Sequence, residues 1–185
     1  MNEKIRCSWC TNDDLYKSYH DKEWGVPITD EYKLFEFLTL EIFQAGLSWY
    51  TVLKKRESFI SAFDKFDFEK ISTYDSKKIE KLMIDKCIIR NKLKINSTII
   101  NAKKFMEVQK TQGSFNKYLS NYKKKYSITK KYASGSYELA LELSKDLKQK
   151  GFKFIGPTII NSFLMAVGVI NGHQKNCFRY LQLSS

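Results

Sequence analysis

The chain has 185 residues, of which 43% are hydrophobic, and it carries a formal net charge of +12. This length fits a single domain over residues 1–185, in one body or two small helical lobes with a shared core, and the apolar content excludes a disordered or fibrous chain. The charge favours a polyanionic partner such as nucleic acid. Because no secretory leader opens the chain and no uncharged apolar stretch could span a bilayer, we expect a cytoplasmic protein.

The apolar periodicity predicts helices along nearly the whole chain, and alternating strand patterns with tight turns are lacking, so we expect an all-α fold. Capping residues, glycines and a proline indicate the boundaries. Seven helices are predicted: from Asp30 to Gly46, from Ser48 to Phe63, from Asp75 to Met83, from Leu93 to Gly113, from Phe115 to Tyr122, from Leu139 to Gly151 and from Pro157 to Val167. The lysine-rich residues 123–136 are expected to form a solvated connection.

Cysteine and histidine residues gather near both ends of the chain, where they could hold a metal ion. The H-x3-C spacing of His173 and Cys177 predicts that they lie one helical turn apart on one face, and Cys7, Cys10 and His20 offer three further ligands. A tetrahedral site could use Cys7, His20, His173 and Cys177, or could take Cys10 in place of one of them. The alternative is that these cysteines are ordinary small buried residues.

All three tryptophans lie in the first part of the chain, with two tyrosines among them. These five residues are Trp9, Tyr16, Tyr19, Trp24 and Trp49. Most aromatic side chains belong to a core, which is the simplest interpretation. Tyrosine and tryptophan also have polar edges that need partners, and flat rings beside a carboxylate form a good pocket for a cationic base.

Glu41 is the candidate carboxylate for such a pocket. It shares a helical face with Phe37, Leu38 and Ala45, so its side chain is expected to point inward. No lysine or arginine lies within four residues of it to form a local ion pair. Either Glu41 sits at the rim of the core and reaches water or a distant arginine, or it is a binding-pocket acceptor.

Two glycines, Gly151 and Gly156, bracket a short apolar segment between two predicted helices. Such a hairpin can expose backbone N–H groups at the start of the second helix, a geometry suited to one phosphate of a DNA strand. A tight connection that needs glycine for positive φ is an equally common explanation.

Four segments of the chain carry further information when they are taken together. They are residues 19–27 (YHDKEWGVP), 40–49 (LEIFQAGLSW), 53–56 (LKKR) and 151–158 (GFKFIGPT). In this order and spacing they resemble the 3-methyladenine DNA glycosylase I family, and the resemblance extends from Cys7 to Cys177. It implies a helix-hairpin-helix glycosylase fold and a monomer that excises 3-methyladenine from alkylated double-stranded DNA.

The resemblance also implies roles for individual residues. One structural Zn²⁺ would be held by Cys7, His20, His173 and Cys177, so Cys10 drops out as a ligand. Glu41 would be the catalytic residue of the base pocket. The other pocket residues would be Tyr19 as a hydrogen-bonding group, Trp49 as the stacking ring, and Trp9, Tyr16 and Trp24 as further walls. Contacts with DNA are implied for Gly151, Phe152, Lys153, Gly156 and Thr158, and for Leu47 as an apolar wedge that fills the gap left by a flipped base.

The chemistry implied by this resemblance suits a labile substrate. Methylation at N3 leaves the adenine formally cationic, so a strong general acid is unnecessary, and we expect Glu41 to supply recognition and electrostatic assistance. Other helix-hairpin-helix glycosylases are expected to carry an aspartate beyond the hairpin, but residues 169–173 (VINGH) contain no acid. We therefore expect 7-methylguanine to be a poor substrate. Cys87, where the family is expected often to have glycine, is predicted to be packed.

Overall fold

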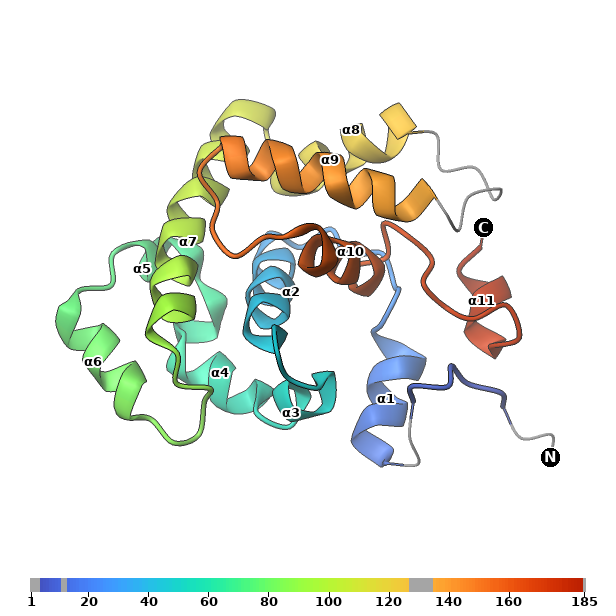
Figure 1. Ribbon diagram of the computed structural model, residues 1–185, viewed down its shortest axis with the longest axis horizontal. Coiled ribbons are helices and arrows are strands. Elements are labelled where there is room, and N and C mark those ends of the chain that lie inside the picture. The colour runs from blue at the N-terminus through green and yellow to red at the C-terminus, as the bar shows by residue number, and fades with distance from the viewer. Residues whose placement is uncertain (1–3, 11–12, 127–134, 185) are drawn as a thin grey trace.

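The computed structural model describes residues 4–10, 13–126 and 135–184, and this part of the chain contains helices and no strand, which confirms the all-α prediction. Figure 1 shows their arrangement. The elements are α1 (Asp14–Lys22), α2 (Glu31–Gln44), α3 (Trp49–Leu53), α4 (Arg56–Ala62), the 3₁₀ turn η1 (Asp64–Phe66), α5 (Phe68–Ser72), α6 (Ser76–Ile84), α7 (Lys92–Gln112), α8 (Phe115–Tyr126), α9 (Gly135–Gln149), α10 (Pro157–Ala166) and α11 (Phe178–Gln182). None of these described helices is long and apolar enough to cross a membrane.

The residues predicted to begin and end helices are found at helix boundaries in the structure. The side chains of Asp30, Ser48 and Asp75 accept hydrogen bonds from backbone N–H groups in the first turns of α2, α3 and α6. Gly113 ends α7 with φ of 87°, and Pro157 occupies the first turn of α10. These boundaries depend on neighbouring residues and were therefore predictable.

The prediction of one helix from Ser48 to Phe63 is wrong. The chain leaves the helical conformation at Lys55, with φ of −99° and ψ of 1°, and separates α3 from α4. No glycine or proline marks this break. Arg56, the first residue of α4, is buried and forms ion pairs with Glu36 and Glu23, and these tertiary contacts replace two residues of local helix.

Two further predictions need correction. Helix α8 continues to Tyr126, past the predicted end at Tyr122, so Lys123 is on a helix and not in a connection. Residues 127–134, including the Lys130–Lys131 pair, lie outside the described residues. Cys87 is exposed, not packed, because it lies in the turn between α6 and α7, where its N–H donates to Asp85 Oδ1 at 2.8 Å.

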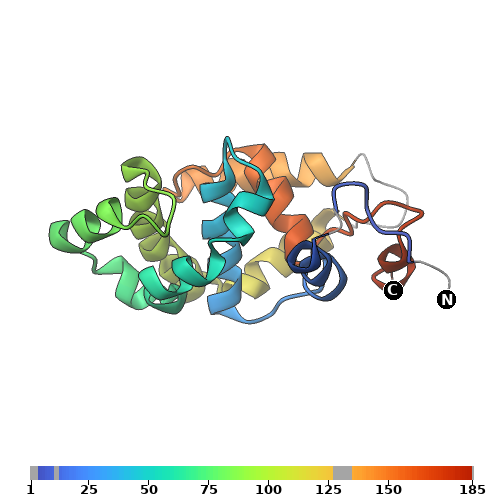
Figure 2. The same cartoon turned by 90° about the horizontal axis from the view of Figure 1, so that it is seen from below.

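Helix α2 lies at the centre of the molecule and contacts α3, α7, α8 and α10. Every residue from Leu34 to Phe43 is buried, so this part of α2 has no face in water, and a polar residue in it must find its partner inside the protein. The first and last described segments of the chain lie at the same side of the molecule, as Figures 1 and 2 show, and the N–H of Phe178 donates to the carbonyl of Ile5 at 2.9 Å.

Candidate functional site

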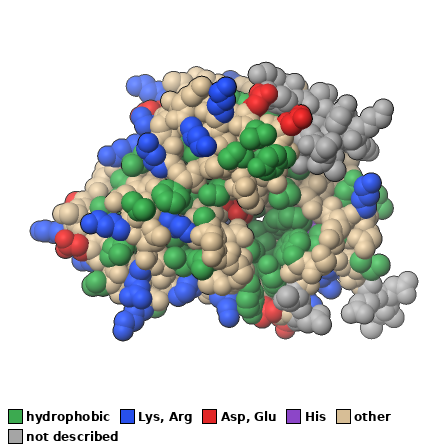
Figure 3. Space-filling model, viewed as in Figure 1, with side chains coloured by type: hydrophobic (Ala, Val, Ile, Leu, Met, Phe, Trp, Pro, Cys, Tyr) green, Lys and Arg blue, Asp and Glu red, His purple; other side chains and the backbone are tan. Residues whose placement is uncertain are grey.

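A pocket of about 270 Å³ opens where α1, α2, α3 and α10 meet. This volume is close to the lower end of the range for small-molecule sites, roughly 300–1,000 Å³. Figure 3 shows a hollow in this face of the molecule, with hydrophobic side chains around it. We call it the aromatic pocket, and its lining residues are Trp9, Tyr16, Tyr19, Trp24, Glu41, Gln44, Trp49, Ser162 and Met165.

All five aromatic residues singled out in the sequence line this pocket. Tyr16 and Tyr19 are three residues apart on α1 and so share its buried face. Trp49 is the first residue of α3, and its ring centroid lies 5.2 Å from that of Tyr19. Trp9 lies edge-on to Trp24 at 4.8 Å. The rings of these residues hold one another in place around the cavity.

Glu41 lies in the middle of α2, and 5% of its surface is exposed. Among the described residues its carboxyl group has no hydrogen bond and no ion pair, so it does not reach a distant arginine, which was one of the two partners that the rim interpretation offered. Burial without compensation raises the pKa of Glu41 to about 8. At pH 7 this group is therefore mostly a neutral carboxylic acid.

Two hydrogen-bond donors of the pocket are also unpaired. The Tyr19 hydroxyl and the Trp49 Nε1–H are buried and have no hydrogen-bond partner among the residues that the structure describes. Unsatisfied buried polar groups each cost about 1–3 kcal/mol, so a native protein rarely retains them without a reason. Together with Glu41 they form one acceptor and two donors facing a flat, apolar cavity. This arrangement can bind a planar heteroaromatic ring, and the buried carboxyl group gives a cationic ring an advantage.

An ion-pair network connects the two sides of the aromatic pocket. Arg56 donates from Nε to Glu36 on α2 at 2.6 Å and from Nη1 to Glu23, directly after α1, also at 2.6 Å. The guanidinium lies over the ring of Phe37, with 5.2 Å from Cζ to the centroid. The network therefore ties the helix that carries Tyr16 and Tyr19 to the helix that carries Glu41.

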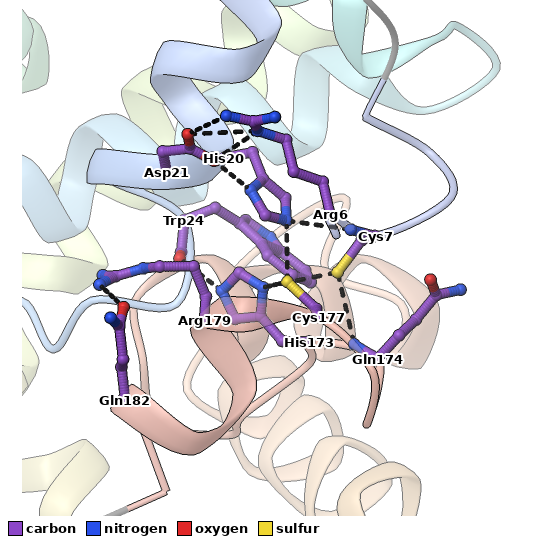
Figure 4. A network of polar contacts seen from close by, with 10 residues as sticks. All are labelled: Arg6, Cys7, His20, Asp21, Trp24, His173, Gln174, Cys177, Arg179 and Gln182. Atoms are coloured by element: carbon purple, nitrogen blue, oxygen red, sulfur yellow. Dashed lines mark hydrogen bonds and ion pairs between the residues drawn. The ribbon is translucent and has the colours of Figure 1, made fainter. Parts of the chain in front are cut away.

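The four residues Cys7, His20, His173 and Cys177 form a second site, which we call the metal cluster. Their ligand atoms all lie within 4.8 Å of one another, and all four residues are buried (Figure 4). The cluster could hold a metal ion. Cys10 is not part of it, although it lies three residues after Cys7. The spacing of the cysteines could not have excluded Cys10, because that choice depends on where the chain ends meet.

The prediction that His173 and Cys177 lie on one helical face is wrong. Residues 173–177 form a turn closed by the N–H of Cys177 and the carbonyl of Gln174 at 2.8 Å, and Cys177 is the N-cap residue of α11. The turn still brings Cys177 Sγ within 3.5 Å of His173 Nδ1. Three residues between two ligands therefore suffice without a helix.

Both imidazoles of the metal cluster are oriented by oxygen acceptors that the sequence did not reveal. His20 Nδ1 contacts Asp21 Oδ1 at 2.8 Å, and Asp21 is held by Arg6 at 2.8 Å. His173 Nε2 contacts the carbonyl of Trp24 at 3.1 Å. These contacts leave the other ring nitrogens facing the sulfur atoms, which is how protein metal sites orient histidine ligands.

The segment of residues 151–156, which we call the hairpin, joins α9 to α10. Gly151 has φ of 93° and Phe154 has φ of 54°. Phe152 is buried, and its N–H donates to the carbonyl of Leu147 at 3.0 Å, so neither its side chain nor its N–H is available to a ligand. Gly156 is the N-cap of α10 and provides no side-chain cap, so the first N–H groups of α10, including that of the exposed Thr158, remain accessible.

Leu47 lies in a tight turn, residues 44–47, which we call the wedge turn. Ala45 has φ of −49° and ψ of 116°, Gly46 has φ of 82°, and the N–H of Leu47 donates to the carbonyl of Gln44 at 2.7 Å. These values describe a type II turn, which needs glycine at its third position. Leu47 is 43% exposed and stands at the surface beside the aromatic pocket.

Sequence reasoning missed three pocket residues, Gln44, Ser162 and Met165. Gln44 is three residues after Glu41 and so was accessible to the same periodicity that identified Glu41. Ser162 and Met165 are likewise three residues apart on α10, but no local pattern indicates that this face of α10 meets α2. They could be found only from the tertiary structure.

Comparison with known proteins gives a consistent result. A family model described as methyladenine glycosylase matches residues 9–180. The chain is 41% identical over 180 residues to DNA-3-methyladenine glycosylase 1 of Escherichia coli (strain K12), covering 95% of this chain and 96% of the relative. It is 37% identical over 177 residues to DNA-3-methyladenine glycosylase of Haemophilus influenzae, covering 93% and 96%.

Solved structures agree with these sequence matches. A crystal structure of 3-methyladenine DNA glycosylase I is similar with a TM-score of 0.84 and 38% identity, covering 94% of this chain and 98% of that one. A structure of 3-methyladenine DNA glycosylase I from Staphylococcus aureus, solved to explain 3-methyladenine recognition, has a TM-score of 0.84 and 37% identity, covering 94% and 95%.

Proposed function

Because the chain belongs to the methyladenine glycosylase family, we propose that it excises 3-methyladenine from alkylated DNA by hydrolysing the N-glycosidic bond, leaving an abasic site. The enzyme is an N-glycosyl hydrolase of DNA repair. The observation that carries the proposal is the buried carboxyl group of Glu41, which has no partner among the described residues, in the aromatic pocket. A non-enzymatic DNA-binding module would have no use for a buried, uncompensated carboxyl group facing an aromatic cavity.

The aromatic pocket is proposed to bind the base after it leaves the DNA stack. The Trp49 ring would stack on the flipped base, with Trp9, Tyr16 and Trp24 as further walls. The Tyr19 hydroxyl would donate a hydrogen bond, and Glu41 would accept from the base. A cationic base favours the ionised form of Glu41, so binding releases the proton that this group holds in the empty pocket. Neutral adenine has no charge that would compensate for ionising the buried Glu41, so the pocket would bind it less tightly.

The reaction needs little acid catalysis. When the bond between the sugar C1′ and the base N9 breaks, its electron pair moves into the cationic ring, and 3-methyladenine leaves as a neutral base. Water adds to C1′ and loses a proton, which completes the abasic site. Positive charge develops on the sugar during this step, and the ionised carboxylate of Glu41 would stabilise it electrostatically. We propose this role and base recognition for Glu41.

Double-stranded DNA would be held by the hairpin and the wedge turn in a helix-hairpin-helix arrangement. The hairpin residues around Lys153 and Gly156, with the N–H of Thr158, would bind one phosphate at the start of α10. Leu47 would enter the base stack and occupy the space left by the flipped nucleotide. The buried side chain of Phe152 would pack in the core under the hairpin, and it would not contact DNA itself. We propose that one copy of the chain, folded as one domain, performs these steps.

The metal cluster is proposed to hold one structural Zn²⁺. Zn–S bonds of about 2.3 Å and Zn–N bonds of about 2.0–2.1 Å at tetrahedral angles imply sulfur–nitrogen separations of about 3.5 Å. The separations are 3.5 Å from Cys7 Sγ to His173 Nδ1, 3.5 Å from Cys177 Sγ to the same atom, and 3.4 Å from Cys177 Sγ to His20 Nε2. Two thiolates and two imidazoles would fill the coordination sphere, so the role of the metal would be to join the chain ends and not to activate water.

The deciding experiment measures release of free 3-methyladenine from methylated duplex DNA by zinc-replete wild type, Glu41→Gln and Glu57→Gln. Glu57 is an exposed glutamate on α4 and serves as the matched control. We expect release by wild type and the control, and a large loss in Glu41→Gln. No release by wild type would refute the glycosylase proposal, whereas full release by Glu41→Gln would refute only the role given to Glu41.

A further inference from the structure

Helix α7 makes side-chain contacts with the backbone of both segments proposed to touch DNA. Lys94 Nζ donates to the carbonyl of Ala45 in the wedge turn at 2.7 Å and to the carbonyl of Phe43 at 3.0 Å. Asn101 Nδ2 donates to the carbonyl of Lys153 in the hairpin at 3.0 Å, and its Oδ1 accepts from the N–H of the same residue at 2.7 Å. The two side chains therefore contact two separate surface segments from one rigid helix.

Lys94 is an unusual residue for its position. It is 5% exposed, lies in the first turn of α7, and among the described residues it has no carboxylate partner. Burial lowers its pKa, and a cation at a helix N-terminus opposes the helix dipole, so local energetics disfavour lysine here. The compensation comes from the carbonyl groups at the C-terminal end of α2, where a cation is favoured.

The carbonyl that Lys94 binds most closely decides the shape of the wedge turn. Ala45 and Gly46 are the two central residues, and the peptide between them carries the Ala45 carbonyl. The orientation of this peptide distinguishes a type II turn from a type I turn. A hydrogen bond to the Ala45 carbonyl therefore selects one orientation of the turn, and with it the direction in which Leu47 leaves the surface.

Asn101 holds the hairpin in an equivalent way. Its side chain is 1% exposed and pairs with both backbone groups of Lys153, directly before the positive φ of Phe154. On the other side, Ser144 Oγ of α9 donates to the carbonyl of Ile155 at 2.6 Å. Asparagine is a poor residue for the interior of a helix, so local propensity does not explain its presence in α7.

Lys94 and Asn101 are seven residues apart, which places them on one face of α7, two turns or about 10.5 Å from each other. In Figure 2 the turn that follows α2 protrudes from one side of the molecule, and the connection between α9 and α10 runs along the same side. We propose that α7 fixes the distance and orientation between the wedge turn and the hairpin, with Lys94 and Asn101 as positioning residues. This inference rests on the proposed function, because both segments are assigned to DNA only there.

The test compares Lys94→Met and Asn101→Leu with Thr98→Val. Thr98 lies between them on α7, is fully buried, and donates from Oγ1 to the carbonyl of Lys94 in its own helix at 3.0 Å. We expect Lys94→Met to lower kcat/KM for base release from methylated duplex DNA by roughly 10- to 100-fold, since misplacement by about 1 Å costs that much. Binding of free 3-methyladenine should stay within about twofold of wild type in all three variants, because the aromatic pocket is unchanged.

Two readouts separate positioning from general loss of stability. In a Leu47→Ala background, Lys94→Met should lower kcat/KM for base release by less than about a further twofold. The reason is that Lys94 would act through the Leu47 side chain, which this background already lacks. Asn101→Leu should weaken binding to undamaged duplex DNA by about tenfold, since phosphate contacts do not depend on the lesion. Additive losses from Lys94→Met and Leu47→Ala, or an excision rate for Lys94→Met equal to that of Thr98→Val, would overturn the inference.

A failure of the proposed function can be distinguished from a failure of the positioning inference. If wild type released no base, amide hydrogen exchange at residues 45–48 would still test the inference. Lys94→Met must then accelerate exchange in this turn while Thr98→Val leaves it unchanged, and equal exchange in the two variants would refute the positioning role of Lys94.

Discussion

His173 and Trp24 connect the metal cluster to the aromatic pocket. The carbonyl of Trp24 contacts His173 Nε2 at 3.1 Å, and the two rings lie edge to face with 4.5 Å between centroids. The same indole ring lines the pocket. The position of one pocket wall is therefore set by a proposed metal ligand, although no pocket atom needs to touch the metal.

This relationship predicts the effect of metal removal. Chelation should loosen the chain ends and lower Tm, because ligand binding energy is part of the folding free energy of such a site. Base release should fall only in parallel with this loss of structure, as followed by calorimetry and by release of 3-methyladenine from the same samples. Loss of base release at an unchanged Tm would contradict a structural role and indicate a chemical one.

The stability of Glu41→Gln relative to wild type should depend on pH. The folded state raises the pKa of Glu41 to about 8, above the ordinary value of 4.5, so the folded state holds a proton that the unfolded state loses. The stability contribution is complete below pH 4.5 and is lost as pH rises to about 8. Glutamine does not ionise, so Glu41→Gln does not lose this contribution. The Tm of the variant minus the Tm of wild type should therefore be larger at pH 8.5 than at pH 5. Equal differences at both pH values would argue against the raised pKa.

The same group should shape the pH dependence of activity. For a substrate that stays cationic, the ionised form of Glu41 is the competent one, so kcat/KM should rise with pH and level off above about 8. The slope below that point should approach tenfold per pH unit. The residual activity of Glu41→Gln should lack this rise. A wild-type profile that is flat from pH 6 to 9 would show that Glu41 is not the titrating group.

Gly46 should be needed for its backbone conformation alone. A Cβ atom there would meet nothing within 4 Å, yet φ is +82°. Gly46→Ala should therefore cost about 1 kcal/mol, or roughly 2–4 °C in Tm, while Gly46→Asn should cost less because asparagine tolerates positive φ. If the two variants lost stability equally, steric contact rather than conformation would be responsible.

A more stable lesion should be a poor substrate. Residues 169–173, after α10, contain no carboxylate, and His173 at the end of this segment belongs to the metal cluster. With no second acidic group available there, we expect 7-methylguanine to be released much more slowly than 3-methyladenine from the same methylated DNA. Chromatography of the released bases measures both at once, and comparable release rates would contradict the prediction.

Local sequence predicted much of the fold but not the path of every helix. Asp30 and Asp75 cap helices because their side chains bond to N–H groups three residues away, which is a property of a short stretch of chain. The break at Lys55 has no such signal, since it follows from burying Arg56 against two glutamates on other elements. Helices α1, α5 and α11 were not predicted. Helices α5 and α11 have five residues each, too few to show a helical period, whereas α1 has nine and its N-cap Asp13, which accepts from the N–H of Tyr16, was a local signal that was overlooked.

The sequence by itself determined that Glu41 shares a helical face with Phe37 and Leu38, since helical periodicity fixes which face of α2 a residue occupies. Only the tertiary structure decided that Glu41 enters a pocket and has no partner in the described part of the chain, because the other walls come from α1, α3 and α10. The same holds for Cys7 and Cys10. Both are possible ligands by spacing, but the meeting of the two chain ends, more than 160 residues apart in the sequence, places Cys7 and not Cys10 beside His173. Periodicity and capping act over a few residues, whereas a binding site is assembled from segments that only folding brings together.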